Sequence, residues 1–579
     1  MSVMTENASQ HSFDPRKVRA LADDFVSRAA ELDPILATSL GLPIRQDQLP
    51  DLSPAGQEAK DELQRATLLQ LTEVEQAAGP GGFAEADERR CAALLRERLE
   101  TALIVSAAGE HLREVSNVFG APAAVRGAFL LMPAETVDDW AVIAARIGQV
   151  PAALAGYQSS LTQGADRGLF AAARQVDTVT GQFEQWLATG GRGWFTDFAE
   201  SAPANAPDSL RADLDGACSA ADAAVADLRA WLLSDYRART AGTPDAMGPE
   251  RYQVGVKRWN GASPDLAETY DWGWAQYRQI LTEMRIEAEL ILPRGTLTEA
   301  MHHLDSHGEV IDGVDAVRNR LQLLMDEAMA NLAGTHFDLA DPIKVVEAKI
   351  APAGSAAAPY YTAPSEDFSR PGRTWLPTLG RTSFPMWELY STWYHEGVPG
   401  HHMQLAQWRY LAAQLSRYQT GLGLVSACVE GWALYAERLM DELGFLHQPG
   451  ARIGYLDAQL MRAIRVIVDI GMHLELPLAA DWAPGAGQRW TPELALEFFA
   501  AHSGRPREFA ESEIVRYLSM PGQAISYKLG ERAWLDGREG ARAARVARGA
   551  SFDLKAWHMA ALSLGSLGLD ELATELALL

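Results

Sequence analysis

Cysteine is scarce in this chain. Only Cys91, Cys218 and Cys428 occur among 579 residues, they lie far apart, and none belongs to a Cys-x-x-Cys pair. A disulfide-stabilised secreted domain needs many cysteines that can pair, so this odd and sparse count argues against a disulfide framework. The count is typical of a protein in a reducing compartment.

Basic residues are in deficit. Lys and Arg total 51 against 76 Asp and Glu, and 51 − 76 gives a formal net charge of −25. A strongly acidic surface repels phosphate backbones and anionic headgroups. We therefore expect neither nucleic acid nor a membrane surface as a partner.

Long apolar runs are also missing. No uninterrupted stretch approaches the roughly 20 residues that span a bilayer, and the first residues, Met1 to Arg16, are polar without a signal-like segment. We therefore expect a cytoplasmic protein. No pattern indicates an oligomeric state.

Helix-forming residues dominate what is present. From Asp14 to about Leu233, apolar residues recur at helical spacing among Ala, Leu, Glu, Arg and Gln. The clearest predicted helices cover residues 63–75, 88–107, 137–163, 266–291 and 314–333. The prediction is a predominantly α-helical fold with a large body of many helices.

The texture changes twice along the chain. A Gly- and Pro-containing segment, 241–249, is the best boundary between an N-terminal helical region (1–240) and a second helical region (241–579). Residues 343–350 alternate and are β-branched, which predicts a strand in a short sheet around 343–384. The two regions form either separate units or one continuous body around a cleft. Helical texture resumes at Met386, and Thr491-Pro492-Glu493 is a typical helix start.

Three of the thirteen histidines fall within eight residues. The stretch reads His395-Glu396-Gly397-Val398-Pro399-Gly400-His401-His402. Imidazoles bind zinc well, and a carboxylate beside a ligand can act as a general base. The stretch therefore predicts a metallohydrolase site between about 395 and 437, with Glu396 as the base.

The spacing does not fit a regular helix. In an α-helix, His401 would lie about 120° around the axis from His395, and His402 roughly 10 Å along it. Pro399-Gly400 can break the helix, since proline lacks a donor and glycine permits unusual dihedrals. If a metal binds, the backbone must bulge there; otherwise the histidines form a surface pair beside a helix break.

Two further acids follow on a probable helix. Glu430 and Glu437 lie seven residues apart in Val429-Glu430-Gly431-Trp432-Ala433-Leu434-Tyr435-Ala436-Glu437 and can face the same way. Apolar neighbours suggest burial, and a buried carboxylate needs a partner such as a metal. The alternative is two solvated glutamates.

These motifs together resemble a known family. His395-Glu396-x-x-Pro399-Gly400-His401-His402 followed by Glu430-Gly431-Trp432 resembles the bacterial family called domain of unknown function 885, and further matching segments extend over nearly the whole chain. More remotely, the arrangement resembles the helical gluzincin peptidases, including thimet-type oligopeptidases, angiotensin-converting enzyme and the HExGH carboxypeptidases.

The resemblance implies a set of roles. It implies one zinc ion held by His395, His401 and Glu430, with His402 as the alternative to His401. It also implies that Glu437 and His402 lie beside the ligands or face the substrate. Because related gluzincins use a Tyr or His from a later helix, it also implies an oxyanion donor, for which we consider Tyr527 and His473, and more weakly Arg516 and Tyr517. Manganese, cobalt or nickel would also accept this ligand set.

A polar stripe marks one later segment. Arg462, Arg465, Asp469 and His473 recur at helical spacing in an otherwise apolar stretch. They either face the substrate or form an internal salt-bridge network, in which Asp469 and His473 pair with each other.

The functional prediction is a zinc-dependent peptidase acting on short peptides. The sequence leaves two alternatives open: a metal-dependent hydrolase of another small amide or ester, and a non-catalytic helical binding protein with a degenerate metal motif. No sequence pattern distinguishes the substrate or the mode of cleavage.

Overall fold

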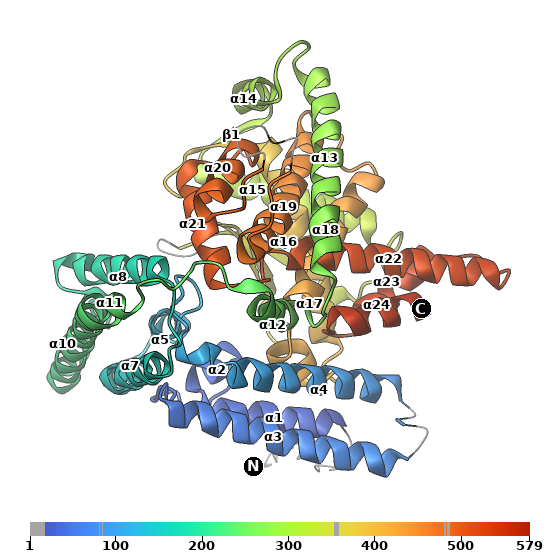
Figure 1. Cartoon of the computed structure of the whole chain (residues 1–579). Coiled ribbons are helices and arrows are strands. Elements are labelled where there is room, and N and C mark those ends of the chain that lie inside the picture. The colour runs from blue at the N-terminus through green and yellow to red at the C-terminus, as the bar shows by residue number, and fades with distance from the viewer. Residues whose placement is uncertain (1–17, 80–81, 84, 353–357, 480–481, 483–486) are drawn as a thin grey trace, which may run out of the picture.

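Helices make up most of the protein. The computed structural model describes residues 18–79, 82–83, 85–352, 358–479, 482 and 487–579 (Figure 1). The chain is 68% helical and 4% strand, which confirms the predominantly α-helical prediction with a small sheet. Within the described residues, none of the helices combines the length and apolar character that crossing a membrane requires.

The first four helices lie together along one side of the body (Figure 1). They are α1 (Val18–Leu32), α2 (Pro34–Ser39), α3 (Pro54–Ala78) and α4 (Ala86–Ala107). Helix α3 begins because the Ser53 side chain accepts a hydrogen bond from the Gly56 backbone and Pro54 occupies the first turn. The helices predicted over 63–75 and 88–107 lie within α3 and α4.

A second group of helices has a hydrophobic core of its own. It contains α5 (Ala121–Phe129), α6 (Val137–Ile147), α7 (Val150–Asp166), α8 (Ala173–Ala188), α9 (Trp194–Ala199), α10 (Asp208–Trp231) and α11 (Arg237–Arg239). The single helix predicted over 137–163 is wrong, because the chain breaks at Gly148–Gln149 into α6 and α7. Pro151 lacks a backbone donor and therefore starts a new helix instead of continuing the old one.

Two long helices of the central region match their predicted bounds closely. This region comprises α12 (Gly248–Asn260), α13 (Leu266–Ile291), α14 (Leu297–His307) and α15 (Val314–Leu332). Helix α13 starts where the Asp265 carboxylate accepts hydrogen bonds from the next backbone amides. Both α13 and α15 carry apolar faces into the main core.

Two small sheets lie just before the histidine motif. Strand β2 (Val346–Ile350) pairs in parallel with β4 (Gly372–Leu376), which pairs antiparallel with β3 (Tyr360–Thr362). Strand β1 (Val310–Asp312) pairs antiparallel with β5 (Ser383–Pro385). The predicted sheet is therefore present. Its first strand starts later than predicted, because Asp341–Lys344 form a 3-10 turn.

The last third of the chain contains the helices that carry the predicted site residues. It contains α16 (Leu389–Glu396), α17 (His401–Tyr410), α18 (Ser426–Glu442), α19 (Ala451–Leu474), α20 (Pro492–His502), α21 (Arg507–Ser519), α22 (Ser526–Ala547), α23 (Leu554–Leu562) and α24 (Leu569–Leu578). Every residue of α19 from Ile453 to His473 is buried, as expected for a central helix packed on all sides. Thr491 caps α20, as predicted.

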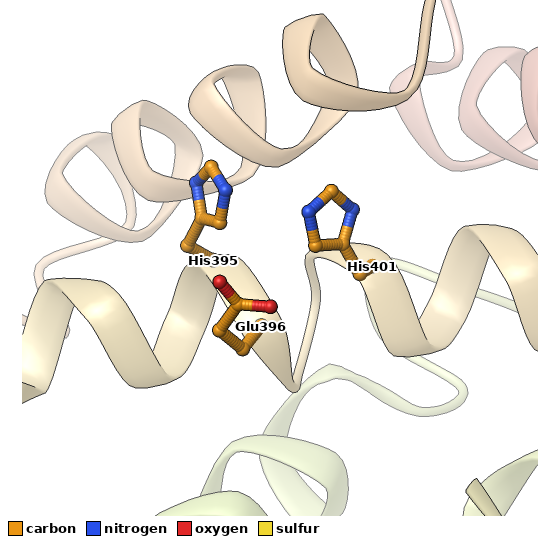
Figure 2. A group of neighbouring side chains, drawn as sticks. All are labelled: His395, Glu396 and His401. Carbon is orange, nitrogen blue, oxygen red and sulfur yellow. The ribbon is translucent and has the colours of Figure 1, made fainter. Parts of the chain in front are cut away.

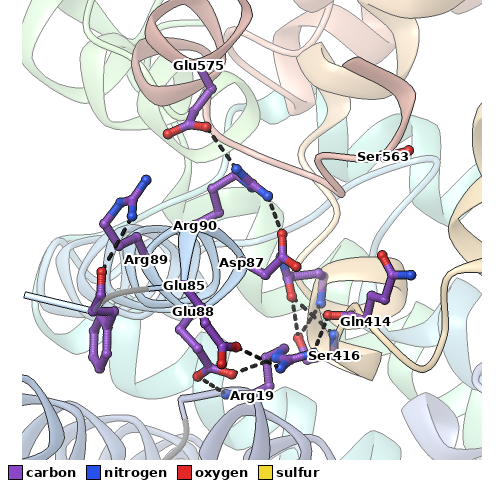
Figure 3. A network of polar contacts seen from close by, with 12 residues as sticks. Arg19, Glu85, Asp87, Glu88, Arg89, Arg90, Gln414, Ser416, Ser563 and Glu575 are labelled. Carbon is purple, nitrogen blue, oxygen red and sulfur yellow. Dashed lines mark hydrogen bonds and ion pairs between the residues drawn. The ribbon is translucent and has the colours of Figure 1, made fainter. Parts of the chain in front are cut away.

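The main hydrophobic core joins the two ends of the sequence. It includes buried residues from 18–99 and again from 252–576, whereas the second core lies between 115 and 236. Polar contacts reinforce this union (Figure 3): Arg19 pairs with Glu88 at 2.6 Å and donates to the Gln414 carbonyl, and Arg90 pairs with Glu575 at 3.0 Å. A division of the chain at residue 240 stays a prediction.

Candidate metal centre

The Pro-Gly segment separates two helices, as the spacing argument required. Helix α16 ends at Glu396 and α17 begins at His401. In between, the Gly400 amide donates to the Tyr394 carbonyl at 2.9 Å. A side chain at Gly400 could not fit, because its Cβ would lie 1.9 Å from the His395 carbonyl oxygen. Glycine therefore permits the tight return of the backbone that places the two helix ends side by side.

This return brings His395 and His401 together. Their ring centroids are 4.8 Å apart and the rings are nearly perpendicular, at 81°. Figure 2 shows both imidazoles next to each other, with the Glu396 carboxylate directed toward the space between them. The three side chains offer ligand atoms that all lie within 4.8 Å of one another.

Glu430 approaches the same two imidazoles from α18. Its Oε2 atom lies 3.3 Å from His395 Nε2 and 3.7 Å from His401 Nε2, and this buried atom has no hydrogen-bond partner among the described residues. Zinc holds imidazole nitrogens and carboxylate oxygens at about 2.0–2.1 Å in a tetrahedron, which separates ligand atoms by about 3.3 Å. The spacing and the chemistry of these three donors fit a zinc ion.

The side chains around this centre carry strongly shifted pKa values. Burial lowers the pKa of His395, but contacts with Glu430 and Glu437 outweigh it and raise the pKa to about 9. Burial lowers the pKa of His401 to about 4, which keeps the neutral ring that a metal requires. For Glu430 the burial effect is outweighed by the two imidazoles, and its pKa falls to about 2.

Glu396 behaves differently from Glu430. Burial raises its pKa to about 8, against the lowering effect of His395. The carboxylate lines the cavity in front of the two imidazoles. A carboxyl group with a pKa in this range can both take up and release a proton near neutral pH.

Glu437 holds His395 in place from behind. Its Oε1 atom accepts a hydrogen bond from His395 Nδ1 at 2.8 Å, and the Ser391 hydroxyl donates to its other oxygen. Arg462 Nη2 lies 3.7 Å from Oε1. Because Nδ1 is engaged by Glu437, Nε2 is the ring nitrogen that faces Glu430 and would be left to hold a metal, as in carboxylate–histidine–metal arrangements. His401 Nδ1 has no such partner among the described residues.

His402 points away from this centre. Its Nε2 donates to the Ile343 carbonyl at 2.7 Å, and its Nδ1 accepts from the Tyr361 hydroxyl at 2.9 Å. The ring is fully buried. Of the two neighbouring histidines, the structure therefore brings His401 to the centre and uses His402 to join α17 to the sheet region.

A cleft opens in front of the centre. It has a volume of about 620 Å³, and His395, Glu396, His401, Glu430 and Tyr527 all lie in its wall. The rest of its wall comes from the sheet region, from α16 and α17, and from α19 and the loop after α20. A substrate in this cleft would reach the metal-binding atoms directly.

Tyr527 reaches the cleft because α18 and α22 cross at two glycines. A Cβ at Gly431 would lie 2.4 Å from the Gly530 backbone, so only glycine allows this approach. No hydrogen bond of the Tyr527 hydroxyl is found within the described part of the chain. The Arg465 guanidinium covers its ring at 4.8 Å. Burial raises the pKa of Tyr527, and the Glu430 charge adds to this, so the hydroxyl remains a donor.

Arg465, Arg516 and Tyr517 meet on a single acid, Glu513. Arg465 Nη2 and Arg516 Nη2 each approach Glu513 Oε2 at 2.8 Å, and the Tyr517 hydroxyl donates to the same atom at 2.5 Å. Arg465 lies in the cleft wall, whereas Arg516 and Tyr517 lie behind it. The latter two are therefore positioned to support Arg465 instead of contacting a substrate.

Asp469 and His473 form a separate buried cluster. Asp469 Oδ2 accepts hydrogen bonds from the Tyr252 hydroxyl at 2.8 Å and from the Gly522 amide at 3.0 Å. His473 donates to the Tyr517 carbonyl and stacks on Tyr252. Both residues are fully buried and neither lines the cleft, so the structure does not bring His473 to the metal centre. The predicted Asp469–His473 contact is present but long, at 3.7 Å.

Several residues of the site were not predicted from the sequence. Arg505 lines the cleft from the loop between α20 and α21, and Tyr361 lines it from β3. Trp432 Nε1 donates to the carbonyls of Pro399 and Gly400 at 3.0 Å, which fastens the Pro-Gly return to α18. The Glu-Gly-Trp motif was a signal for this last contact, while Arg505 carries no local signal.

Comparisons with known proteins extend over nearly the whole chain. Residues 34–576 match the family model described as "Bacterial protein of unknown function (DUF885)". A crystal structure of a "putative lipoprotein" from Colwellia psychrerythraea superposes with a TM-score of 0.80 at 21% identity, covering 96% of this chain and 98% of that one. A "putative lipoprotein of unknown function" from Shewanella oneidensis gives a TM-score of 0.74 at 19% identity, covering 96% and 99%. No curated protein matches the sequence.

Proposed function

The chain belongs to this bacterial family of unknown function, and we propose that it is a zinc-dependent metallopeptidase that hydrolyses short peptides. One observation carries the proposal: Glu430 Oε2, which makes no hydrogen bond in the described structure, converges with the two imidazoles of His395 and His401 at the wall of an open cleft. Buried polar atoms without partners are costly, so such a convergence supports a bound cation.

The donor set defines what a metal would contribute. His395, His401 and Glu430 would hold the ion and leave a position open toward the cleft. Zinc, when bound, would supply a water whose pKa is lowered from about 15.7 to about 7 and would polarise the scissile carbonyl. The resemblance to the helical gluzincins belongs to this proposal.

Glu396 would handle the proton. Its carboxylate faces the cleft beside both imidazoles, and its pKa is about 8 because burial outweighs the lowering effect of the His395 charge. It can therefore accept a proton from the attacking water and hand it to the leaving amine nitrogen. Glu437 keeps the His395 ring oriented throughout.

Tyr527 would stabilise the charge that develops on the scissile oxygen. Its hydroxyl has no hydrogen-bond partner in the described structure, and the residue lines the same cleft as Glu396. A preorganised donor at such a place typically contributes about 10²–10³-fold to the rate. We assign this role to Tyr527 and not to His473, which lies outside the cleft.

The location of the protein stays a prediction. The descriptions of the two structural neighbours apply to those proteins, and at their level of identity the likeness supports the fold alone. We propose a cytoplasmic location, which fractionation of the native host with an antibody would test.

A matched pair of variants tests the function. Zinc-loaded wild-type protein, Glu396→Gln and Glu388→Gln would be incubated with a peptide library, and cleavage would be measured by mass spectrometry. Glu388 lines the same cleft but pairs with Arg381 at 3.2 Å, so it controls for loss of one negative charge.

The proposal predicts distinct outcomes for the three proteins. Glu396→Gln should cut about 10²–10⁴-fold more slowly while keeping its zinc, and Glu388→Gln should stay within about threefold of the wild type. Zinc-loaded wild-type protein that cleaves no peptide would contradict the peptidase assignment. If it hydrolyses small amides or esters instead, the alternative hydrolase would take its place.

A further inference from the structure

Four arginines among the described residues line the cleft, and three of them remain when Arg381, which pairs with Glu388, is set aside. Arg462 and Arg465 come from consecutive turns of α19, and Arg505 comes from the loop after α20. We call these three residues the arginine subsite. Its concentration of positive charge contrasts with the formal net charge of −25 of the whole chain.

One terminal nitrogen of Arg465, Nη1, has no hydrogen-bond partner among the described residues. Its Nε donates to the Tyr517 hydroxyl at 3.0 Å and its Nη2 pairs with Glu513 at 2.8 Å. No partner of Nη1 is found in the described residues, although the residue as a whole is only 7% exposed. Tyr517 and Glu513 therefore hold one side of the guanidinium, and Nη1 is the donor left for a ligand in the cleft that Arg465 lines.

Arg462 is paired even less completely. Its Nη1 donates to the Ala458 carbonyl, its Nε is buried without a partner in the described part of the chain, and its Nη2 lies 3.7 Å from Glu437 Oε1. That same Glu437 oxygen already accepts from His395. The Glu437 carboxylate already accepts hydrogen bonds from His395 and Ser391, so it pairs with Arg462 only at the longer distance.

The acid behind Arg465 does not balance the charge around it. Glu513 is shared by Arg465 and Arg516, which places two positive charges against one negative charge. Arg505 pairs with Asp457 at 2.8 Å. Arg462 is attracted only at longer range, by Glu437 at 3.7 Å and by Asp457, Glu396 and Glu430. Buried unmatched positive charge is unfavourable, and a guanidinium fork is the side chain best suited to hold a carboxylate.

The subsite lies next to the groups expected to react. The guanidinium carbons of Arg465 and Arg462 are 4.8 Å and 6.0 Å from the centre of the Tyr527 ring. Tyr527 and Glu396 share the same cleft wall. An anion held here would therefore be only a few bonds from the scissile carbonyl of a bound substrate.

We propose that the arginine subsite binds a free carboxylate next to the scissile amide, so that the substrates are N-acylated amino acids, including peptides with a free C-terminus. This inference rests on the proposed function and narrows it to release of the terminal amino acid. The amide C–N bond breaks, the water oxygen joins the acyl carbon, and the amine nitrogen receives the proton. The products are a carboxylic acid and a free amino acid.

Binding to an inactive variant tests the subsite without depending on turnover. Zinc-loaded Glu396→Gln protein would be titrated calorimetrically with N-benzoylglycyl-leucine and with its C-terminal carboxamide, and the titrations would be repeated without zinc. We expect the free acid to bind about 10–100-fold more tightly in both cases, the range of a charge-assisted hydrogen bond. Equal affinities, or no binding of either compound, would overturn the proposal.

Second-site variants identify the residues responsible. Adding Arg465→Gln should reduce the preference for acid over amide to below about threefold, with partial recovery in Arg465→Lys. Arg505→Gln, at a more exposed position, provides a second variant if the buried Arg465 change prevents folding. Arg381→Gln is the control, because Arg381 lines the same cleft but is paired with Glu388. A loss of preference in Arg381→Gln as large as in Arg465→Gln would mean that net charge alone is responsible.

Rates of hydrolysis distinguish a failure of the proposed peptidase function from a failure of the proposed carboxylate subsite. If wild-type protein hydrolyses the acid and the amide equally well, the proposed function stands and the subsite assignment fails. If the acid binds preferentially but zinc-loaded wild-type protein hydrolyses neither compound, the subsite stands and the peptidase function fails. N-acetyl-leucine and a tripeptide with a free C-terminus then distinguish simple acylated amino acids from peptides.

Discussion

Two buried histidine–carboxylate clusters lie in the same half of this protein, and only one of them opens to a cleft. In the metal-centre cluster, His395, His401 and Glu430 direct one ligand atom each at the same point in the cleft wall. In the closed cluster, Asp469 and His473 lie on α19, pack against Tyr252 and do not line this cleft.

This contrast distinguishes a cluster that could take part in a reaction from one that only stabilises the fold. Both clusters combine buried imidazoles with carboxylates, so residue type alone does not identify the reactive one. What differs is convergence on a cleft. The unpartnered Asp469 Oδ1 lies 3.7 Å from a single imidazole inside the core, whereas Glu430 Oε2 faces two imidazoles at the cleft wall. The following changes should affect one cluster and leave the other intact.

The largest difference is expected between two adjacent histidines. His401→Ala should weaken zinc binding by more than the roughly 100-fold typical of losing a residue that merely supports a ligand. His402→Ala should change zinc affinity by less than about tenfold but lower the free energy of unfolding by about 1–3 kcal/mol, because the Ile343 carbonyl and Tyr361 hydroxyl lose their partner. Competition with a chelating indicator and urea unfolding measure the two quantities. The reverse pattern would exchange the roles of the two residues.

An intermediate effect is expected at Glu437. Glu437→Gln keeps the shape of the side chain but removes the charge that orients His395, so zinc affinity should fall about 10–100-fold. Glu442→Gln, on the same helix but paired with Arg538, is the matched control and should leave zinc affinity unchanged. Similar losses in both variants would show that the charge of α18 matters more than the contact with His395.

The closed cluster should respond in stability alone. Tyr252→Phe removes the hydroxyl that donates to Asp469 Oδ2, and we expect the free energy of unfolding to fall by about 1–3 kcal/mol. Zinc affinity and peptide cleavage of the folded protein should match the wild type. A selective loss of zinc in this variant would join the two clusters functionally.

The smallest effect concerns pH. Burial raises the pKa of Asp469 to about 7 in the folded protein, whereas an unfolded aspartate has a pKa of about 3.9. Between these values the folded state holds the proton more tightly, so this group contributes stability at low pH that is lost as pH rises toward about 7. Relative to Asp469→Asn, the wild type should lose up to about 1 kcal/mol per pH unit between about pH 5 and 7. Parallel pH profiles of urea unfolding would contradict this assignment.

Local sequence patterns predicted the fold well where one principle dominated. Helix α13 has the predicted bounds because its apolar spacing is regular and Asp265 caps its start. The prediction of one helix over 137–163 was wrong. The apolar spacing is regular both before and after Pro151, and the prediction gave that spacing more weight than the helix-start signal of Pro151. Strand β2 begins three residues later than predicted, because the 3-10 turn at Asp341–Lys344 occupies the start of the alternating stretch.

The site was predictable only in part for the same reason. The spacing of His395 and His401 required a bulge at Pro399-Gly400, and the bulge is present. Spacing alone did not decide between His401 and His402, since the choice depends on Ile343, which is distant in sequence. The resemblance also nominated His473, because periodicity cannot distinguish a buried face of α19 from a face in the cleft.

The central claim is that Glu430 is a metal ligand and Glu396 is not. The most direct test is the zinc content of purified wild-type protein, Glu430→Gln and Glu396→Gln after identical loading and dialysis, measured by mass spectrometry of the metal. We predict about one zinc per chain in the wild type and in Glu396→Gln, and almost none in Glu430→Gln. Full zinc content in Glu430→Gln, or its loss in Glu396→Gln, would contradict the proposed metal centre.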